Sequence, residues 1–238
     1  MTQPDPTNTM RKIFIKTALA ALFATGVIAS ANASSLLVNG GFETNVASGT
    51  VFNPSNASFN ALLSGVTAYG VRQGIDLQTT GSGYGLAPQQ GQWKVSPASD
   101  LGGAAEEFSM ALTAPLSLGS RYQLDFYIER LSTGGFDGGT VEIGVSNSGT
   151  SFGIQVATAT APSSGWLLSS TAFFAPVSGS FLTVRVTNTR SSWVGLDNFS
   201  LNGVGAVPEP GAALLLLAGI FGVGFAARRR LSEAQQEA

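Results

Sequence analysis

The 238-residue chain contains no cysteine and no histidine. Without cysteine there is neither a disulfide framework nor thiolate chemistry. Without histidine the chain lacks the commonest general base and the commonest transition-metal ligand. These absences exclude serine–histidine and cysteine catalysis, and they make an extracellular hydrolase the least favoured function class. We therefore expect a protein that is not an enzyme.

Charged residues are also scarce, at 11% of the chain. Residues 34–207 contain six basic and ten acidic residues, so this part has a net negative charge. Such a surface repels phosphate backbones, and nucleic acid is not expected as a partner. Glycine, by contrast, occurs 30 times. This composition is typical of a β-rich extracellular domain with many turns rather than of a helical cytosolic enzyme.

Residues 1–33 have the pattern of a secretory signal peptide. A basic segment comes first, then an apolar run, then small residues: Arg11, Lys12 and Lys16, followed by 17–28 and by Ala31-Asn32-Ala33. This order predicts export, with cleavage after Ala33 or, alternatively, after Ala31. Residues 1–9 are polar and add nothing to the signal, so Met10 is an alternative translation start. A permanent N-terminal anchor is disfavoured because the apolar run is short.

Residues 206–238 combine three features in a fixed order. The segment Pro208-Glu209-Pro210 precedes the uncharged stretch 211–227, and Arg228, Arg229 and Arg230 follow. As a transmembrane helix the uncharged stretch would be about 25 Å long, close to the thickness of a bilayer core. Arginines at a membrane edge stay in the cytoplasm, which would put the preceding domain on the outer side.

This order of features resembles the PEP-CTERM sorting signal. The resemblance implies recognition by exosortase, a membrane transpeptidase-like enzyme of Gram-negative bacteria that make exopolysaccharide. Glu209 with its flanking prolines would be the recognition element. The protein would be anchored in the inner membrane with its domain in the periplasm before processing, and would then reach the cell surface or extracellular matrix. A plain C-terminal anchor is the alternative, and it places the domain on the same side.

Residues 34–205 show the two-residue periodicity of β-strands. Apolar residues occupy every second position in 121–129, 141–145, 152–156 and 182–186. Glycine-rich and Asn-rich turns separate these segments, and Asn147-Ser148-Gly149 predicts a hairpin. No amphipathic helical window of useful length is present, and 44–64 is predicted to be a long loop with at most one weak strand. The pattern predicts an all-β fold, an antiparallel β-sandwich or jelly roll.

Two short segments lie at opposite ends of this domain, Asn39-Gly40-Gly41-Phe42-Glu43 and Leu196-Asp197-Asn198-Phe199 with Leu201. They resemble carbohydrate-binding modules of the galactose-binding-like jelly-roll type. The resemblance implies that the terminal strands lie together, with a structural Ca²⁺ held by the Glu43 and Asp197 carboxylates and by backbone oxygens near Gly41. Oxygen ligands of this kind suit Ca²⁺.

Two alternatives to the calcium site remain open for the Asp197 carboxylate, which parity places on the core side. An arginine or a backbone N–H could pair with it, because an unpaired buried carboxylate is costly. A β-bulge at Asp197-Asn198 could instead rotate the side chain outward.

Aromatic and polar residues concentrated in 68–95 make that segment a candidate sugar site. Sugars are held by aromatic stacking and by paired hydrogen bonds. The candidate ligand-binding residues are Tyr69, Arg72, Asp76, Trp93 and Tyr127. Tyr127 is included because it falls on the polar parity of its strand. The alternative is that aromatic residues such as Trp93 only cover the core of the sandwich.

Glu106 and Glu107 form the most conspicuous carboxylate pair. Adjacent residues on a strand point to opposite faces, so this pair is not expected to flank one glycosidic bond. We predict that it marks a solvated strand end. Trp193 is likewise predicted to serve in core or edge packing.

The sequence thus predicts an exported, non-catalytic surface or matrix protein that is associated with exopolysaccharide. The alternative is a structural or adhesive extracellular protein that binds other proteins and no sugar.

Overall fold

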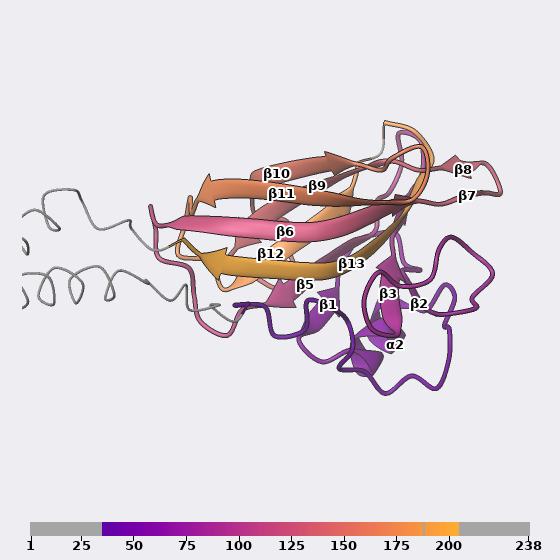
Figure 1. Cartoon of the computed structure of the whole chain (residues 1–238), viewed down its shortest axis with the longest axis horizontal. Coiled ribbons are helices and arrows are strands. Elements are labelled where there is room, and N and C mark those ends of the chain that lie inside the picture. Colours follow the sequence, from indigo (N-terminus) through magenta and orange to yellow (C-terminus); the bar gives the residue numbers. More distant parts are fainter. Residues whose placement is uncertain (1–34, 188, 205–238) are drawn as a thin grey trace, which may run out of the picture. The chain divides into compact units, whose positions relative to one another are not determined.

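The structure is a computed structural model that describes residues 35–187 and 189–204 (Figure 1). The predicted signal peptide, transmembrane helix, Pro208-Glu209-Pro210 segment and arginine cluster lie outside these residues. Within them, no helix has the length and apolar character that crossing a membrane requires.

The described part is almost entirely β-structure. Its elements, in chain order, are α2 (Asn56–Leu62), β1 (Val66–Ala68), β2 (Asp76–Thr79), β3 (Trp93–Ser96), β4 (Ala98–Ser99), β5 (Glu107–Ala111), β6 (Arg121–Arg130), β7 (Ser132–Thr133), β8 (Phe136–Asp137), β9 (Thr140–Ser146), β10 (Ile154–Thr160), β11 (Trp166–Phe174), β12 (Phe181–Val186) and β13 (Ser192–Gly203).

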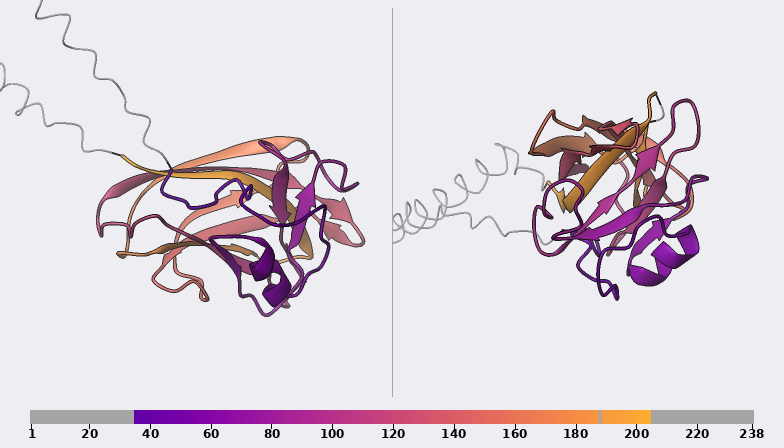
Figure 2. Two further views of the ribbon diagram at one scale, coloured as in Figure 1. Left: turned by 90° about the horizontal axis from the view of Figure 1, so that it is seen from below. Right: turned by 90° about the vertical axis from the view of Figure 1, so that its right-hand side faces the viewer.

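Two antiparallel sheets form the layers of a sandwich. The first has five strands in the order β1-β5-β12-β9-β10, and the second has six in the order β11-β6-β13-β3-β2. The short strand β4 pairs with β13, and β7 pairs with β8 in a separate ribbon. Figures 1 and 2 show the two sheets facing each other, with the β7–β8 ribbon at one end. The predicted all-β, antiparallel β-sandwich is confirmed.

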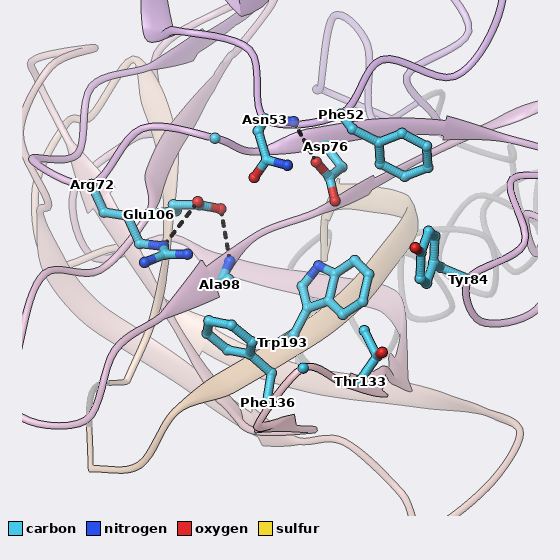
Figure 3. Close-up of a pocket in the computed structure, with 12 residues that line it drawn as sticks. Phe52, Asn53, Arg72, Asp76, Tyr84, Ala98, Glu106, Thr133, Phe136 and Trp193 are labelled. Atoms are coloured by element: carbon cyan, nitrogen blue, oxygen red, sulfur yellow. Dashed lines mark hydrogen bonds and ion pairs between the residues drawn. The ribbon is translucent and has the colours of Figure 1, made fainter.

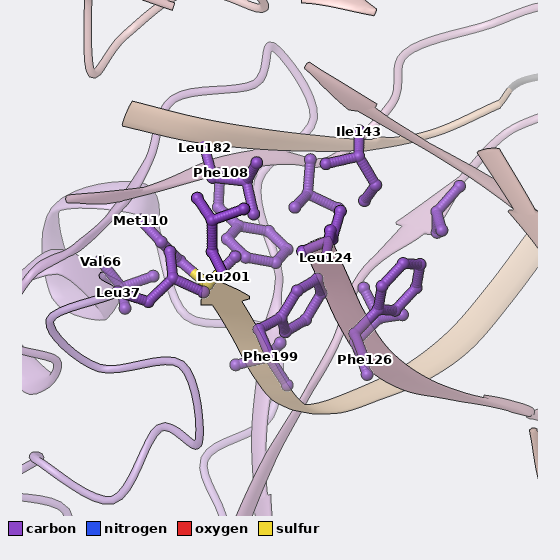
Figure 4. Packing of buried hydrophobic residues seen from close by; sticks show 14 of the residues in the cluster. Leu37, Val66, Phe108, Met110, Leu124, Phe126, Ile143, Leu182, Phe199 and Leu201 are labelled. Carbon is purple, nitrogen blue, oxygen red and sulfur yellow. The ribbon is translucent and has the colours of Figure 1, made fainter. Parts of the chain in front are cut away.

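Strand β6 shows why the alternation in the sequence produces this arrangement. Its apolar positions, including Leu124 and Phe126, are buried, whereas the intervening Gln123 and Asp125 are only half-buried. A strand points successive side chains to opposite faces, so one face of β6 enters the core. There Phe126 stacks on Phe199 of β13, with ring centroids 4.8 Å apart (Figure 4).

The first and last segments of the described chain lie side by side. The Leu36 N–H donates to the Leu201 carbonyl at 2.8 Å, and the Phe199 N–H donates to the Gly40 carbonyl at 2.9 Å. A Cβ at position 40 would collide with the Phe199 carbonyl, so this approach requires glycine. This juxtaposition agrees with the resemblance of the two terminal segments to galactose-binding-like modules.

Two local predictions were wrong. The predicted loop 44–64 contains the helix α2, which the Ser55 side chain caps by accepting from the Ser58 N–H. With only 7 residues, α2 is too short to show a helical period, and the burial of Phe59 against the core stabilises it. On β10, Ile154 is 51% exposed although it pairs with the buried Val145, because β10 is the edge strand of its sheet.

A candidate binding pocket lined by aromatic and acidic side chains

A pocket with a volume of about 420 Å³ lies beside the β7–β8 ribbon (Figure 3). This volume is in the range of small-ligand sites. Four aromatic rings line it, together with three charged side chains and several polar ones. The aromatic residues are Phe52, Tyr84, Phe136 and Trp193; the charged residues are Arg72, Asp76 and Glu106; the polar side chains include Asn53 and Thr133.

Three of the rings form one wall, with Tyr84 in contact with the other two. The Tyr84 ring lies 5.4 Å from the Trp193 ring at an interplanar angle of 58°, and 5.4 Å from the Phe52 ring at 84°. The Trp193 indole N–H donates to the Ser96 carbonyl, which fixes the ring. Tyr84 and Phe52 are each 42% exposed. This wall therefore presents apolar surface that a ligand can cover.

Arg72 joins two acidic residues on the opposite side. Its Nε donates to Glu106 Oε1 at 3.1 Å, and its Nη1 donates to Asp100 Oδ2 at 2.5 Å. The Ala98 N–H donates to the other Glu106 oxygen at 2.8 Å, so both oxygens of this buried carboxylate have protein donors. Burial raises the pKa of Glu106 to about 7; the Ala98 N–H and Arg72 oppose this, and the nearby Asp76 charge adds to it.

Asp76, at the start of β2, is the second buried carboxylate in the pocket, with an exposed fraction of 5%. Its Oδ1 accepts from the Asn53 N–H at 2.7 Å, whereas its Oδ2 has only a long contact of 3.5 Å to Gln78 Nε2. Figure 3 shows this second oxygen pointing into the pocket, on the side of Trp193. Burial raises the pKa of Asp76 to about 6, against the opposing effect of its hydrogen bonds and of Arg72.

A buried ion pair fixes the loop that carries Tyr84. Lys94 Nζ lies 2.5 Å from Glu129 Oε1, and the two side chains are 0% and 1% exposed. Lys94 also donates to the carbonyls of Tyr84 and Leu86, at 3.2 and 2.7 Å, and the Leu86 N–H donates to Glu129 at 2.8 Å. The loop backbone thus satisfies both charges, and in return its position is set by them.

The structure brings only some of the candidate ligand-binding residues together. Arg72 and Asp76 line the pocket, as does Tyr84 from the same sequence segment. Trp93 is in the hydrophobic core, so its ring offers no face to a ligand and the core-covering alternative holds for it. Tyr69 and Tyr127 lie outside the pocket: the Tyr69 hydroxyl is buried, and Tyr127 is half-buried on the outward parity of β6.

Sequence reasoning missed most of the site. No sequence pattern marked Phe52 or Phe136 as a binding residue, and Trp193 was predicted to serve in packing alone. The prediction for Glu106 was wrong, because this residue is buried rather than solvated. Its charge is compensated by Arg72, which lies 34 positions earlier in the chain. No pattern among residues that are neighbours in the sequence indicates an ion-pair partner so far away.

The Glu43 and Asp197 carboxylates both accept from backbone N–H groups of the short segment 90–93. Burial raises the pKa of Asp197 to about 6, and the Glu43 charge adds to this. Asp197 is fully buried and accepts from the N–H groups of Gln90 and Asn198, at 3.0 and 2.6 Å. Glu43 Oε1 accepts from the N–H groups of Gln92 and Trp93.

A β-bulge is present between Asp197 and Ser200, yet it leaves Asp197 inside. The outward-rotation alternative was therefore wrong. Backbone N–H groups do donate to Asp197, and the calcium site stays a prediction. Among the residues that the structure describes, no group of three or more acidic side chains surrounds a metal-sized space.

The raised pKa values of Asp76 and Glu106 have a consequence for stability. Both groups hold protons more tightly in the folded protein than in the unfolded chain, where their pKa values are about 4. Their contribution to stability is therefore fully present below pH of about 4 and is lost as the pH rises through about 7. We expect the free energy of unfolding in urea to fall on the order of 2–4 kcal/mol between pH 5 and 8.

The double variant Asp76→Asn/Glu106→Gln should flatten this decline, whereas Asp125→Asn, outside the pocket, should keep it. A wild-type stability that rises from pH 5 to pH 8 would contradict the assignment.

No family model matches the chain, and no curated protein matches it. Similar solved structures include TmCBM61 in complex with β-1,4-galactotriose, at 19% identity and a TM-score of 0.45, covering 71% of this chain and 99% of that one. A second is the CBM22-1 xylan-binding domain of Paenibacillus barcinonensis Xyn10C, at 15% identity and a TM-score of 0.43, covering 75% and 100%. A third is the enzymatically active domain of the bacteriophage CBA120 tailspike protein 4, at 15% identity and a TM-score of 0.41, covering 65% and 21%. These similarities are distant, and the ligands named belong to those proteins.

Proposed function

We propose that this domain binds carbohydrate without catalysing its conversion, and that the ligand occupies the pocket between the aromatic wall and Asp76. The observation that carries the proposal is the combination of half-exposed rings with hydrogen-bonding groups in one cavity. Tyr84 and Phe52 offer apolar faces, and Asn53, Arg72 and Asp76 offer donors and acceptors. Sugar rings require both, because they carry apolar C–H faces and hydroxyl edges.

The two pocket carboxylates raise the question of hydrolysis, because a glycosidase uses a pair of acidic residues. Both oxygens of Glu106 are already bound, by Arg72 and by the Ala98 N–H. Only Asp76 retains an oxygen without a short hydrogen bond. One available carboxylate cannot supply both an acid and a base or nucleophile, so this geometry favours binding over catalysis.

The structural or adhesive alternative is supported by a different feature. Strand β11 is at the edge of its sheet and contains no charged residue. Leu168 and Phe174 on this strand are exposed. Uncharged edge strands are places where another chain can add by backbone pairing.

Binding to a glycan array, followed by titration calorimetry with the best glycan, tests the carbohydrate proposal. Phe52→Ala and Tyr84→Ala each remove a half-exposed ring, and we expect each to weaken binding about tenfold or more. Phe174→Ala removes an equally apolar, 67% exposed ring outside the pocket and should leave the affinity unchanged.

Absence of any glycan ligand for the folded protein would overturn the carbohydrate proposal and leave the adhesive role. Release of reducing sugar from a bound glycan would contradict its non-catalytic part.

We further propose that the chain is exported and then sorted by exosortase, so that the pocket meets exopolysaccharide at the cell surface or in the matrix. The support is the signal-peptide pattern of residues 1–33 and the ordered Pro-Glu-Pro, apolar and arginine segments of 206–238. Before processing, the apolar segment would hold the protein in the inner membrane with its domain in the periplasm.

Sorting is tested by replacing the acidic residue of the Pro-Glu-Pro segment in the native host. We expect Glu209→Ala to keep the protein at its unprocessed mass in the inner membrane, whereas Glu233→Ala, beyond the arginine cluster, should be released normally. Fractionation and mass spectrometry give the readout. Equal release of both variants would contradict recognition through Glu209.

We also propose a structural Ca²⁺ held by Glu43 and Asp197, with backbone oxygens near Gly41 completing its ligands. Two neighbouring carboxylates repel each other, and a divalent cation between them would remove that repulsion. The fit is limited by the four backbone N–H groups that already donate to these carboxylates.

Melting in the presence of Ca²⁺ and of a chelator tests this site. We expect chelation to lower the melting temperature of the wild type and to have a smaller effect on Glu43→Gln. An unchanged wild-type melting temperature would end the calcium proposal without affecting the others.

A further inference from the structure

The charges around the pocket do not balance. Arg72 is the one cationic side chain among the described residues that line it, and Asp76 and Glu106 are the acidic ones. Two nitrogens of Arg72 are already paired, with Glu106 and with Asp100. The single positive charge of Arg72 is therefore already outweighed by its own two acidic partners, and Asp76 adds a further negative charge that has no ion-pair partner among the described residues.

Asp76 is a buried carboxylate without a direct ion-pair partner among the described residues. Its Oδ1 is held by the Asn53 N–H, whereas its Oδ2 points into the cavity with only the 3.5 Å contact to Gln78. Gln78 in turn accepts a hydrogen bond from Ser82, so its amide is kept in place. A charged oxygen with so few donors is costly to bury, and a cationic group in the cavity would offset that cost.

The aromatic rings around Asp76 Oδ2 also favour a cationic ligand. Aromatic faces carry negative potential and attract ammonium and guanidinium groups. The same pocket already shows one such contact, since the Arg72 guanidinium lies 5.4 Å from the centre of the Phe136 ring. Phe52, Tyr84 and Trp193 form the remaining aromatic surface near Asp76, and none of the described cationic side chains lies over their faces.

We propose that the pocket selects a sugar residue with a free ammonium group, a glucosamine-type unit of a polysaccharide whose amines are not acetylated. This rests on the proposed carbohydrate binding and names its ligand class. The ammonium group would donate to Asp76 Oδ2 and lie against the faces of Tyr84 and Trp193. An N-acetylated sugar lacks the charge, and a uronic acid would be repelled by Asp76.

Calorimetry with oligosaccharides of equal length and linkage isolates the charge. The probes are β-1,4-linked glucosamine, N-acetylglucosamine and glucose, titrated into the purified protein at pH 7. We expect the glucosamine oligomer to bind at least about tenfold more tightly than the other two, which corresponds to one charge-assisted hydrogen bond. Added salt should weaken this preference.

The variant Asp76→Asn removes the charge while its side-chain oxygen can still accept from the Asn53 N–H. We expect it to bind all three oligomers with similar affinity and to keep a cooperative melting transition. Asp125→Asn, which makes the same change on β6 outside the pocket, should keep the wild-type preference.

A pH series on the unmutated protein gives an independent readout. The groups that face Asp76 are Arg72, which stays charged, Glu106, and the uncharged Asn53 and Gln78. Below a pH of about 6 the ligand amine is fully protonated while Asp76 loses its charge, so affinity for the glucosamine oligomer should decline there. Affinity for the N-acetylglucosamine oligomer should not follow this decline.

The outcomes distinguish a failure of the ammonium inference from a failure of the proposed carbohydrate binding. Equal affinity for the three oligomers, or tighter binding of a neutral one, would overturn the ammonium inference and leave carbohydrate binding intact. No binding of any glycan, here or on the array, would overturn the proposed function itself. A preference for glucosamine that survives in Asp76→Asn would overturn the role of this carboxylate.

Discussion

The buried ion pair between Lys94 and Glu129 is the interaction on which the pocket depends. Burying two charges away from solvent destabilises the fold unless hydrogen bonds satisfy their donors and acceptors. Here the satisfying groups are backbone atoms of Tyr84 and Leu86. The requirement to satisfy the ion pair therefore fixes the loop, and the loop places the Tyr84 ring beside Trp193.

The other buried carboxylates also need hydrogen-bond donors or cations, and these needs are met to different degrees. Asp197 is compensated by backbone N–H groups, and Glu106 by Arg72 and the Ala98 N–H. Asp76 is the exception, because one of its oxygens has only a marginal partner. A buried charge that lacks hydrogen-bond partners is unfavourable, and proteins retain such charges mainly at binding sites, where a ligand supplies the missing partner. This contrast separates Asp76 from the carboxylates that are fully compensated within the protein.

The sequence predicted the fold well wherever burial follows a fixed period. The alternation of apolar and polar residues in β6, β9 and β12 could be recognised because one face of each strand packs against the core. The prediction failed in two places. Ile154 follows the alternation but stays exposed because β10 is an edge strand, and α2 is too short to display a helical repeat. For the site, Arg72 and Asp76 could be selected from their residue types. Which of Trp93 and Trp193 lines the pocket could not be predicted, because this depends on how the sheets pack.

By itself, the sequence determined the strand alternation, the negative charge of the domain, the absence of histidine and cysteine chemistry, and the ordered motifs at the two termini. These are properties of composition and of neighbours along the chain. Only the tertiary structure decided which side chains share a cavity and which charges are compensated. Phe52, Tyr84 and Trp193 come from three distant segments, and their contacts arise from sheet packing and loop closure. The energy of a buried charge depends on its spatial neighbours, and the order of residues along one strand does not contain that information.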